Sequence, residues 1–221
     1  MKVNESIYDE KNARLVHDND VIDRPIKAYA TISDLLSPHG TAVTFLKGQR
    51  IPLLNKGEKV LYIIMDGYVS YRYFSNDMTL TYAFSPIIIG IMGMFASFST
   101  GFFKAESTVS TLRIDMTTCE SVLNSQPHLW RSYAEIISFA FQRLQLRDMT
   151  LTKKKTHDIV CSILIELINQ PSIVRENITA AQYILDRLPI SRSLVMDIIS
   201  GLKRTNKIEV SKGYLLNVID L

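Results

Sequence analysis

Residues 178–219 read ITAAQYILDRLPISRSLVMDIISGLKRTNKIEVSKGYLLNVI, a stretch that contains the signals of two short helices and a hairpin. Thr179 is a favourable N-cap for the first helix, and Gln182, three residues later, completes a capping box. Ser191 is the N-cap candidate of the second helix, and the chain turns between the helices over about three residues, 188–190. Two short helices joined by a tight turn predict helix-turn-helix geometry.

The apolar residues of both helices recur at the spacing of a single buried face. They are Ala181, Ile184 and Leu185 in the first helix, and Val195, Ile198, Ile199 and Leu202 in the second. Two short apolar runs, 208–210 and 214–218, then flank the tripeptide Ser-Lys-Gly. This pattern predicts a wing, a small hairpin whose tip at Lys212 and Gly213 can approach a phosphate backbone closely.

In a winged helix-turn-helix, the N-terminal residues of the second helix reach base edges in the major groove. We therefore expect a recognition helix over 191–204 that enters the major groove of promoter DNA. The residues expected to read bases are Ser191, Arg192, Ser193 and Met196, and those expected to lie near phosphates are Thr179, Gln182, Lys203, Lys207 and Lys212. Two bonds from Arg192 to a guanine would contribute roughly 1–3 kcal/mol of discrimination.

The distribution of charge agrees with a polyanionic partner. Residues 1–150 contain 15 Lys and Arg against 15 Asp and Glu, whereas residues 151–221 contain 10 against 7, so the whole net charge of +3 lies in the C-terminal part. Phosphate contacts supply most of the non-specific affinity for DNA. Solvated surfaces also show such an excess, and a helix–turn–helix–hairpin also serves protein contacts. A dimeric interaction adaptor without sequence-specific DNA binding is therefore the alternative function.

The chain before this domain has a different pattern. Residues 26–40 carry a short helical pattern that ends at Pro38–Gly40, after a loosely ordered or helical lead-in over 1–25. Short β-type runs then follow at 43–46, 59–65, 68–74, 79–84 and 106–116, separated by turn residues. Asp66–Gly67 suits a tight hairpin turn because glycine tolerates a positive φ. The runs predict an antiparallel sandwich or barrel.

The stretch from Met78 to Phe103 contains no charged residue and has the length of a membrane span. Pro86, Gly90, Gly93 and Gly101 interrupt it, so buried strands joined by glycine turns fit better than a membrane helix. The first twenty residues are polar and have no apolar signal-peptide core. With 47% hydrophobic and 21% charged residues, we expect a globular cytoplasmic protein without a membrane partner.

A long helical pattern begins near Pro127 and continues to residue 149. Its apolar residues form a broad stripe that can serve as a coiled-coil seam between two subunits. The expected dimer-interface residues are Leu129, Tyr133, Ile136, Ile137, Ala140, Phe141 and Leu144. The stripe is also wide enough to pack on the helix's own β-domain. The expected segments are a lead-in (1–25), a β-domain (26–124), the long helix (125–150) and the DNA-binding domain (151–221).

Enzyme chemistry has no recognisable motif in this sequence. The four histidines lack metal-ligand spacing, and no glycine-rich phosphate loop, nucleophile elbow or paired-carboxylate motif is present. The sequence has two cysteines, Cys119 and Cys161, which are far apart, and this excludes a zinc finger or a four-cysteine cluster. Cys161 lies among apolar residues and is expected to be a buried, inert thiol, which leaves Cys119 as the candidate for redox chemistry. We expect no metal and no cofactor.

The order of β-roll, long helix and winged helix-turn-helix resembles the cyclic-AMP receptor and fumarate–nitrate regulator (CRP/FNR) superfamily over nearly the whole chain. Matching segments are Val60–Val69, Ile190–Ser193, Val195, Ile198–Ile199, Leu202 and Asn206–Ile208. The chain is most similar to the enterobacterial IprA-type regulators linked to oxidative-stress resistance, through Leu36–Thr41, Leu129–Arg131, Leu146–Asp148, Ser191–Ser193 and Lys212–Gly213. The resemblance implies an α+β fold with an antiparallel β-roll, a dimerisation helix and a C-terminal winged helix-turn-helix. It also implies a homodimer that regulates promoters in stress or virulence, with RNA polymerase as a further candidate partner.

Two departures from the superfamily concern the cyclic-nucleotide site. Where the superfamily has a Gly-Glu pair for the ribose, this chain has Gly93–Met94. The region 98–105, which should supply an arginine for the phosphate, offers only Lys104. Because no guanidinium is present to hold the phosphate in two bonds, we expect no cyclic nucleotide to bind.

Overall fold

The structure, a computed structural model, describes residues 14–17, 20–96, 99–153 and 155–221. The strands in these residues are β1 (Arg14–His17), β2 (Asp20–Asp23), β3 (Thr41–Phe45), β4 (Arg50–Ile51), β5 (Leu54–Asn55), β6 (Glu58–Asp66), β7 (Tyr68–Tyr73), β8 (Thr79–Phe84), β9 (Ile87–Ile89), β10 (Gly101–Ala105), β11 (Val109–Asp115), β12 (Ile208–Ser211) and β13 (Tyr214–Val218). The helices are α1 (Ile26–Leu36), α2 (Met116–Ser125), α3 (Leu129–Leu151), α4 (Thr156–Ile168), α5 (Ser172–Arg175), α6 (Ala180–Leu185) and α7 (Arg192–Arg204), with two 3₁₀ turns, η3 (Ser37–His39) and η4 (Ile91–Gly93).

These elements form two compact units. One unit comprises residues 25–138, and the other comprises residues 139–221 together with the β1–β2 pair. The division passes through α3, whereas the boundaries drawn from the sequence are at residues 124 and 150. We refer to the first unit as the β-domain.

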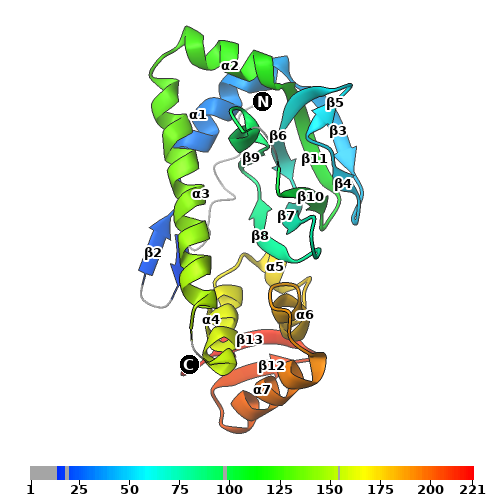
Figure 1. Ribbon diagram of the computed structural model, residues 1–221, viewed down its shortest axis with the longest axis vertical. Helices are drawn as coiled ribbons and strands as arrows, with labels where there is room; N and C mark the ends of the chain where they lie inside the picture. Colours follow the sequence, from blue (N-terminus) through cyan, green and yellow to red (C-terminus); the bar gives the residue numbers. More distant parts are fainter. Residues whose placement is uncertain (1–13, 18–19, 97–98, 154) are drawn as a thin grey trace. The chain divides into compact units, whose positions relative to one another are not determined.

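The β-domain is an antiparallel sandwich of two sheets (Figure 1). One sheet has the order β4-β10-β7-β8, and the other has the order β3-β11-β6-β5, with β9 also paired to β6. The strands predicted from the sequence are confirmed, with small shifts at their ends. Asp66–Gly67, predicted as a hairpin turn, is different: β6 and β7 belong to different sheets, so the turn carries the chain from one sheet to the other. Gly67 has the positive φ, 86°, that the prediction required.

Strand β6 is buried on both faces, which explains its nearly continuous apolar sequence. Val60, Tyr62 and Ile64 point into the core between the two sheets. Leu61 and Ile63 point the opposite way, into a second core formed with α1, α2 and the first turns of α3. The alternation of side chains along a strand therefore connects the sandwich to its helical layer.

The helical layer contains one element that the sequence reasoning missed. Helix α1 and the turn η3 match the pattern predicted over 26–40, and α3 begins two residues after the expected Pro127. Helix α2 was not predicted. The sequence pattern predicts a strand over 106–116 and no helix between that strand and Pro127. Its residues Met116, Cys119 and Leu123 are buried against the layer.

The uncharged stretch from Met78 to Phe103 forms β8, β9, η4 and the first part of β10, as predicted, with residues 97–98 outside the described part. Among the described residues, none of the helices has both the length and the apolar composition that a membrane crossing needs.

Only part of the lead-in segment, residues 1–25, can be compared with the sequence prediction. Residues 1–13 and 18–19 of this segment lie outside the described residues. Where it is described, the segment forms a strand pair instead of the expected loosely ordered or helical lead-in: Arg14–His17 pairs antiparallel with Asp20–Asp23, with Leu15 opposite Ile22. β-Branched residues at 16, 21 and 22 favour this extended backbone.

Candidate nucleic-acid interface

The two helices of the predicted helix-turn-helix are α6 and α7, and each has the expected side-chain cap. The hydroxyl of Thr179 accepts a hydrogen bond from the backbone N–H of Gln182 at 3.2 Å, and the hydroxyl of Ser191 accepts one from Leu194 at 3.2 Å. The capping box is only half formed, because the Gln182 amide donates to Asp186 at 2.8 Å. Both caps hold their helices at the start, where backbone N–H groups lack partners.

The link between the helices is longer than predicted. Helix α6 ends at Leu185 and α7 begins at Arg192, so the chain turns over 186–191 rather than over 188–190. The extra turn buries Arg187, whose guanidinium lies 3.5 Å from the ring centre of Tyr183. Arg187 is therefore a structural residue of the domain's interior.

An ion pair with the half-buried Glu166 ties the buried Arg187 to α4. The Arg187 Nη2 lies 3.3 Å from Glu166 Oε1, and the Tyr183 hydroxyl donates to the same oxygen at 2.9 Å. Burial alone would raise the pKa of Glu166, but Arg187, Arg143 and the hydrogen bonds from Tyr183 and Arg187 outweigh it and hold the pKa below its usual value. Glu166 is thus charged at neutral pH, and the pair ties α6 to α4.

Strands β12 and β13 form the predicted wing, with Ser211 opposite Tyr214 in the register. The two residues at its tip, Lys212 and Gly213, have φ values of 49° and 86°. Two successive positive φ values are typical of a type I′ hairpin turn. The carbonyl of Gly213 accepts a hydrogen bond from the N–H of Ala180 at 2.9 Å. The wing tip is therefore held at the start of α6, beside Thr179.

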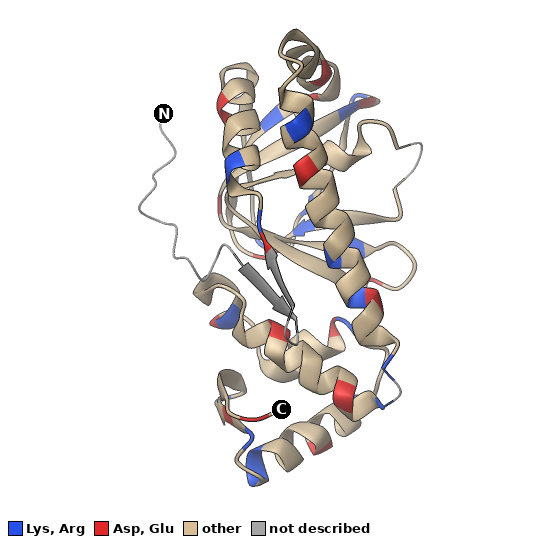
Figure 2. Ribbon diagram, turned by 90° about the vertical axis from the view of Figure 1, so that its left-hand side faces the viewer, with Lys and Arg blue, Asp and Glu red and all other residues tan. Residues whose placement is uncertain are grey.

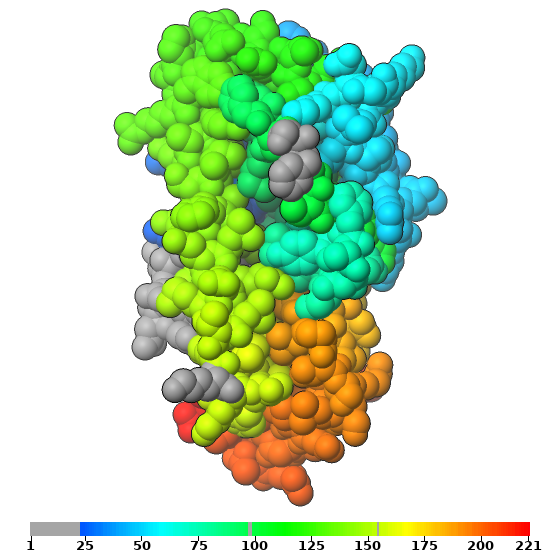
Figure 3. Space-filling view, viewed as in Figure 1, coloured from blue at the N-terminus to red at the C-terminus, as the bar shows by residue number. Residues whose placement is uncertain are grey.

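Helix α7 is anchored by Val195, Ile199 and Leu202, which are buried in the domain. On the opposite side, four exposed residues recur at helical spacing: Ser193, Asp197, Ser200 and Arg204. We call these residues the outward strip. Figure 3 shows the surface of α7, in orange, along the lower edge of the view.

Three of the residues predicted from the sequence lie in a row next to the outward strip. Arg192, Met196 and Lys203 are exposed and follow one another at spacings of four and seven residues. The sequence reasoning did not select Asp197, Ser200 or Arg204. The helical period measured from the buried residues would have identified all three, because they stand opposite that buried face.

The predicted phosphate contacts do not all point to one surface. Lys203 and Lys212 are exposed. The Nζ of Lys207, in contrast, lies 3.9 Å from a carboxylate oxygen of Asp220. Lys207 is half-buried, whereas Lys203 and Lys212 are exposed. Because the Lys207 ammonium already has a carboxylate neighbour, we assign it no phosphate in the proposal below.

The ribbon coloured by charge shows acidic segments among the basic ones in the C-terminal domain (Figure 2). Asp197 contributes one of these charges within the outward strip itself. The domain thus presents a few separated cations rather than a continuous basic face.

Helix α3 presents two different sides. Leu129 and Ile136 are 0% and 1% exposed and belong to the β-domain core. They are therefore not available to contact a second subunit, and we do not include them in the proposed dimer interface. They face the core because α3 closes the helical layer over β6. The side next to them carries the other five residues: Tyr133, Ile137 and Ala140 are half-buried, and Phe141 and Leu144 are 59% and 45% exposed. We call these five residues the α3 stripe.

The two cysteines have environments opposite to those expected. Cys119 is completely buried, and burial, with a smaller contribution from Glu120, raises the pKa of its thiol to about 12. Cys161 is half-buried, and its Sγ lies 3.6 Å from Nδ1 of His157. Burial also raises the pKa of Cys161. Cys119 is therefore the inert thiol, and Cys161 is the more accessible one.

Residues 156–221, which contain α4 to β13, match a protein family described as "Winged helix-turn-helix DNA binding". The family match covers the elements whose geometry is given above. It confirms the sequence prediction for the C-terminal domain.

Two relatives carry the name "Inhibitor of hydrogen peroxide resistance". The protein from Salmonella typhimurium strain LT2 is 25% identical over 199 residues, which cover 89% of this chain and 95% of the relative. The protein from Escherichia coli K12 is 23% identical, with coverages of 88% and 94%. The similarity to the enterobacterial IprA-type regulators predicted from the sequence is confirmed.

Three solved structures are similar in fold to this chain. The c-di-GMP-responsive global regulator CLP of Xanthomonas campestris has a TM-score of 0.69 at 13% identity, over 87% of this chain and 99% of its own. FixK2 of Bradyrhizobium japonicum has a TM-score of 0.66 at 14% identity, with coverages of 82% and 98%. A CRP/FNR-family regulator of Thermus thermophilus has a TM-score of 0.58 at 19% identity, with coverages of 80% and 94%. The chain thus has a CRP/FNR-like fold.

Proposed function

We propose that this chain is a DNA-binding transcription regulator that acts as a homodimer. The observation that carries the proposal is helix α7 of a domain that matches the winged helix-turn-helix DNA-binding family. One side of the helix is buried at Val195, Ile199 and Leu202. The other side presents Ser193, Asp197, Ser200 and Arg204, polar and charged side chains that can contact a DNA groove. The base, phosphate and dimer contacts of individual residues are part of the same proposal.

Base contacts come from the start of α7 and from the outward strip. Arg192 donates to guanine, as expected from the sequence, with Ser191, Ser193 and Met196 beside it. Asp197 joins them as an acceptor for the amino group of cytosine. The phosphate contacts are assigned to Thr179, Gln182, Lys203, Arg204 and Lys212, which position the protein on DNA without specifying sequence.

A gel-shift experiment on promoter fragments tests this function. Wild-type protein is expected to retard specific fragments, and the retardation should weaken steeply with added salt. Arg192→Ala is expected to lose the preference among fragments while keeping weak binding to all of them. Lys207→Ala serves as the matched control that keeps both. Absence of any retardation at low salt would refute the proposal and favour a protein-interaction adaptor.

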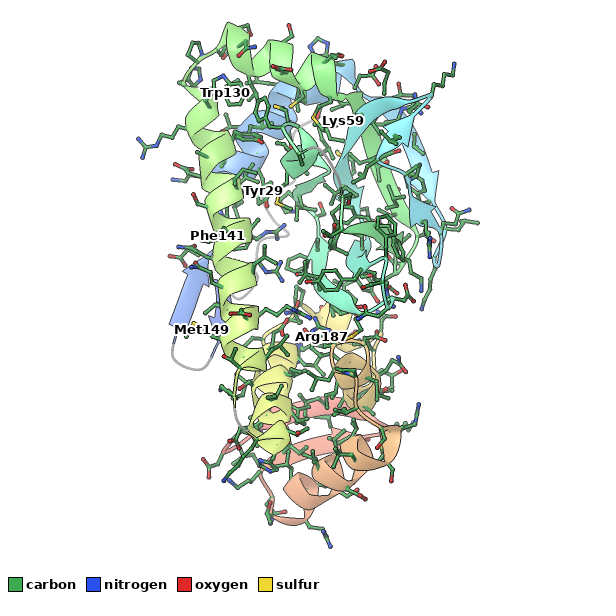
Figure 4. The ribbon with its side chains drawn as sticks, viewed as in Figure 1. Tyr29, Lys59, Trp130, Phe141, Met149 and Arg187 are labelled. Carbon is green, nitrogen blue, oxygen red and sulfur yellow. The ribbon has the colours of Figure 1, made fainter. Side chains whose placement is uncertain are left out.

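The homodimer is assigned to the α3 stripe. Phe141 and Leu144 expose large apolar side chains along one side of α3, and Figure 4 labels Phe141 on this helix. Phe141→Glu should place a charge in the seam and convert the dimer to a monomer in sedimentation velocity, because a buried unpaired charge is costly. Gln142→Glu, at the next exposed position, is the control that stays dimeric. A dimeric Phe141→Glu protein would contradict this interface.

We further propose that the β-domain binds no cyclic nucleotide. Gly93 and Met94 stand where the superfamily has its ribose-binding pair, and their carbonyl oxygens accept hydrogen bonds from Lys59. Lys104 is half-buried on β10 and lacks the fork of a guanidinium. Titration of the protein with cyclic AMP and cyclic GMP in a calorimeter should give no saturable heat. Saturable binding of either nucleotide would overturn this assignment.

The genes that the protein controls are assigned to stress responses. The support is the name of its relatives, "Inhibitor of hydrogen peroxide resistance". Chromatin immunoprecipitation before and after peroxide exposure should recover promoters of peroxide-defence genes. RNA polymerase stays a predicted partner at these promoters. A target set without such genes would contradict the role in stress.

A further inference from the structure

Lys59, near the start of β6, extends its side chain to a loop that follows η4. Its Nζ donates to the carbonyl oxygens of Gly93 at 2.9 Å, Met94 at 3.4 Å and Ala96 at 2.7 Å. An ammonium has three N–H donors, so these three carbonyls satisfy all of them. Bonds from a charged donor are stronger than those between neutral groups. One side of the 93–96 loop is thereby fixed to β6.

The other side of the same loop lies on α3. Phe95 stacks on Trp130 with a centroid distance of 6.0 Å and an interplanar angle of 26°. It also meets Tyr133 edge to face at 6.4 Å, and Trp130 and Tyr133 contact each other at 5.3 Å. Such aromatic pairs contribute attraction beyond the area that they bury. Figure 4 labels Trp130 on the first turns of α3 and Lys59 on the strand across η4.

We propose that the 93–96 loop is a built-in clamp that ties the first two turns of α3 to β6 through Lys59 and Phe95. The adjacent side of these turns is already held, because Leu129 and Ile136 are buried in the core. Trp130 and Tyr133 only border that core and are half-buried. The clamp covers the side of α3 that the core leaves open, and it uses only residues of the chain itself.

The clamp has a consequence for the dimer, and this consequence rests on the proposed function. Tyr133 belongs both to the clamp and to the α3 stripe. A chain that fixes the start of α3 by itself needs no small effector to align the stripe for a second subunit. The clamp itself, however, is a property of the β-domain and can be measured without DNA.

Trp130 is the only tryptophan of the chain, so its fluorescence reports on the clamp directly. Lys59→Met keeps the length of the side chain and removes its charge, and Lys47→Met changes an exposed lysine in a turn of the same domain as a control. Acrylamide should quench Trp130 more strongly in Lys59→Met. Chymotrypsin should cut after Phe95 roughly tenfold faster, because losing the three solvent-exposed or partly buried bonds of Lys59 makes local opening of the loop easier.

Hydrogen exchange of the amides of residues 129–136, followed by mass spectrometry, tests whether the loop holds α3. We expect faster exchange in Lys59→Met and in Phe95→Ala, and little further change in the double variant, because both act through one loop. Circular dichroism verifies that each variant is folded, and Phe95→Leu provides a milder second variant. Unchanged quenching and cleavage in Lys59→Met would overturn the clamp. Faster cleavage with unchanged exchange in 129–136 would overturn its action on α3.

These measurements separate the clamp from the proposed function. Failure of wild-type protein to bind DNA would refute the proposed function and leave the quenching and exchange results intact. Normal DNA binding with an unaffected Lys59→Met variant would refute only the clamp.

Discussion

The wing offers a substitution that removes one charge without disturbing the backbone. Lys212 has a φ of 49° and precedes Gly213, so an alanine at this position would add strain. Lys212→Asn instead creates Asn-Gly, the pair that type I′ turns prefer. The hairpin and its hydrogen bond from Ala180 to Gly213 should therefore persist, and only the ammonium is lost.

The expected effect follows from counterion release. Each phosphate that a protein cation neutralises contributes about 0.9 to the slope of log K against log salt concentration. A homodimer carries two wings, so Lys212→Asn should make the slope less steep by about 2. Discrimination between promoter fragments should stay unchanged, because a phosphate contact carries no sequence information.

Fluorescence anisotropy of labelled promoter DNA, titrated between about 50 and 200 mM potassium chloride, measures this slope. Lys207→Gln is the matched control, since the Lys207 ammonium has Asp220 as its neighbour and is assigned no phosphate. Its slope should equal that of wild type. A Lys212→Asn slope equal to wild type, or an equal loss in Lys207→Gln, would refute the placement of the wing at the phosphates.

Three further predictions concern stability and thiol chemistry. Arg187→Met leaves the half-buried Glu166 without its ion-pair partner and should lower the free energy of unfolding by about 2 kcal/mol, measured by urea denaturation. Because the folded-state pKa of Glu166 is lowered, its stabilising contribution is present above its ordinary pKa of 4.5 and disappears as the pH falls below that value. The stability difference between wild type and Glu166→Gln should shrink accordingly in acid. In native protein, iodoacetamide should label Cys161 slowly and Cys119 only after unfolding, as read by mass spectrometry.

Each of these predictions has a contradicting outcome. Phe139→Leu changes a buried α3 side chain outside the ion pair and should lower the free energy of unfolding less than Arg187→Met does. An equal loss in the two variants would mean that the ion pair has no special role in stability. A stability difference for Glu166→Gln that grows in acid would reverse the sign argued for its pKa. Labelling of Cys119 before Cys161 in folded protein would contradict their burial.

The winged helix-turn-helix was predictable because its signals are local. Thr179 and Ser191 cap the two helices, the apolar period gives their buried faces, and Lys212–Gly213 forms the turn of the wing. The longer strands also show in the sequence through their apolar runs. The two-residue strands β4 and β5 do not, because two residues cannot show a period and their pairing depends on distant partners.

Helix α2 shows why burial can outweigh local preference. Its sequence, MTTCESVLNS, has two β-branched threonines directly after its first residue, and it follows an alternating strand. Asp115, its N-cap, makes no side-chain capping bond. The helix is instead held by Met116, Cys119 and Leu123, which share one buried face. Helix propensity is a weak prior that tertiary packing overrides, so the strand pattern masked this helix.

Charged side chains of the site could not be sorted from the sequence. Arg187, Lys207 and Arg204 all appear there as cations near the recognition helix. In the folded domain, Arg187 is buried against Glu166, Lys207 lies beside Asp220, and Arg204 faces outward. Which of these cations faces outward depends on carboxylates that are distant in sequence and on which residues of α7 lie on its buried side. Sequence patterns therefore predict the domain more fully than its DNA-facing residues.

The resulting scarcity of outward cations makes dimerisation part of DNA binding. Each proposed protomer surface offers Arg192, Lys203, Arg204 and Lys212 to DNA, with Asp197 opposing them. Because Arg192 contacts a base, the three cations at phosphates, Lys203, Arg204 and Lys212, would give a slope of about −2.7 for one protomer and twice that for two. One domain alone would thus bind weakly at moderate salt. The monomeric Phe141→Glu variant should accordingly show half the wild-type slope, and a full slope would mean that the second copy contributes no phosphate contacts.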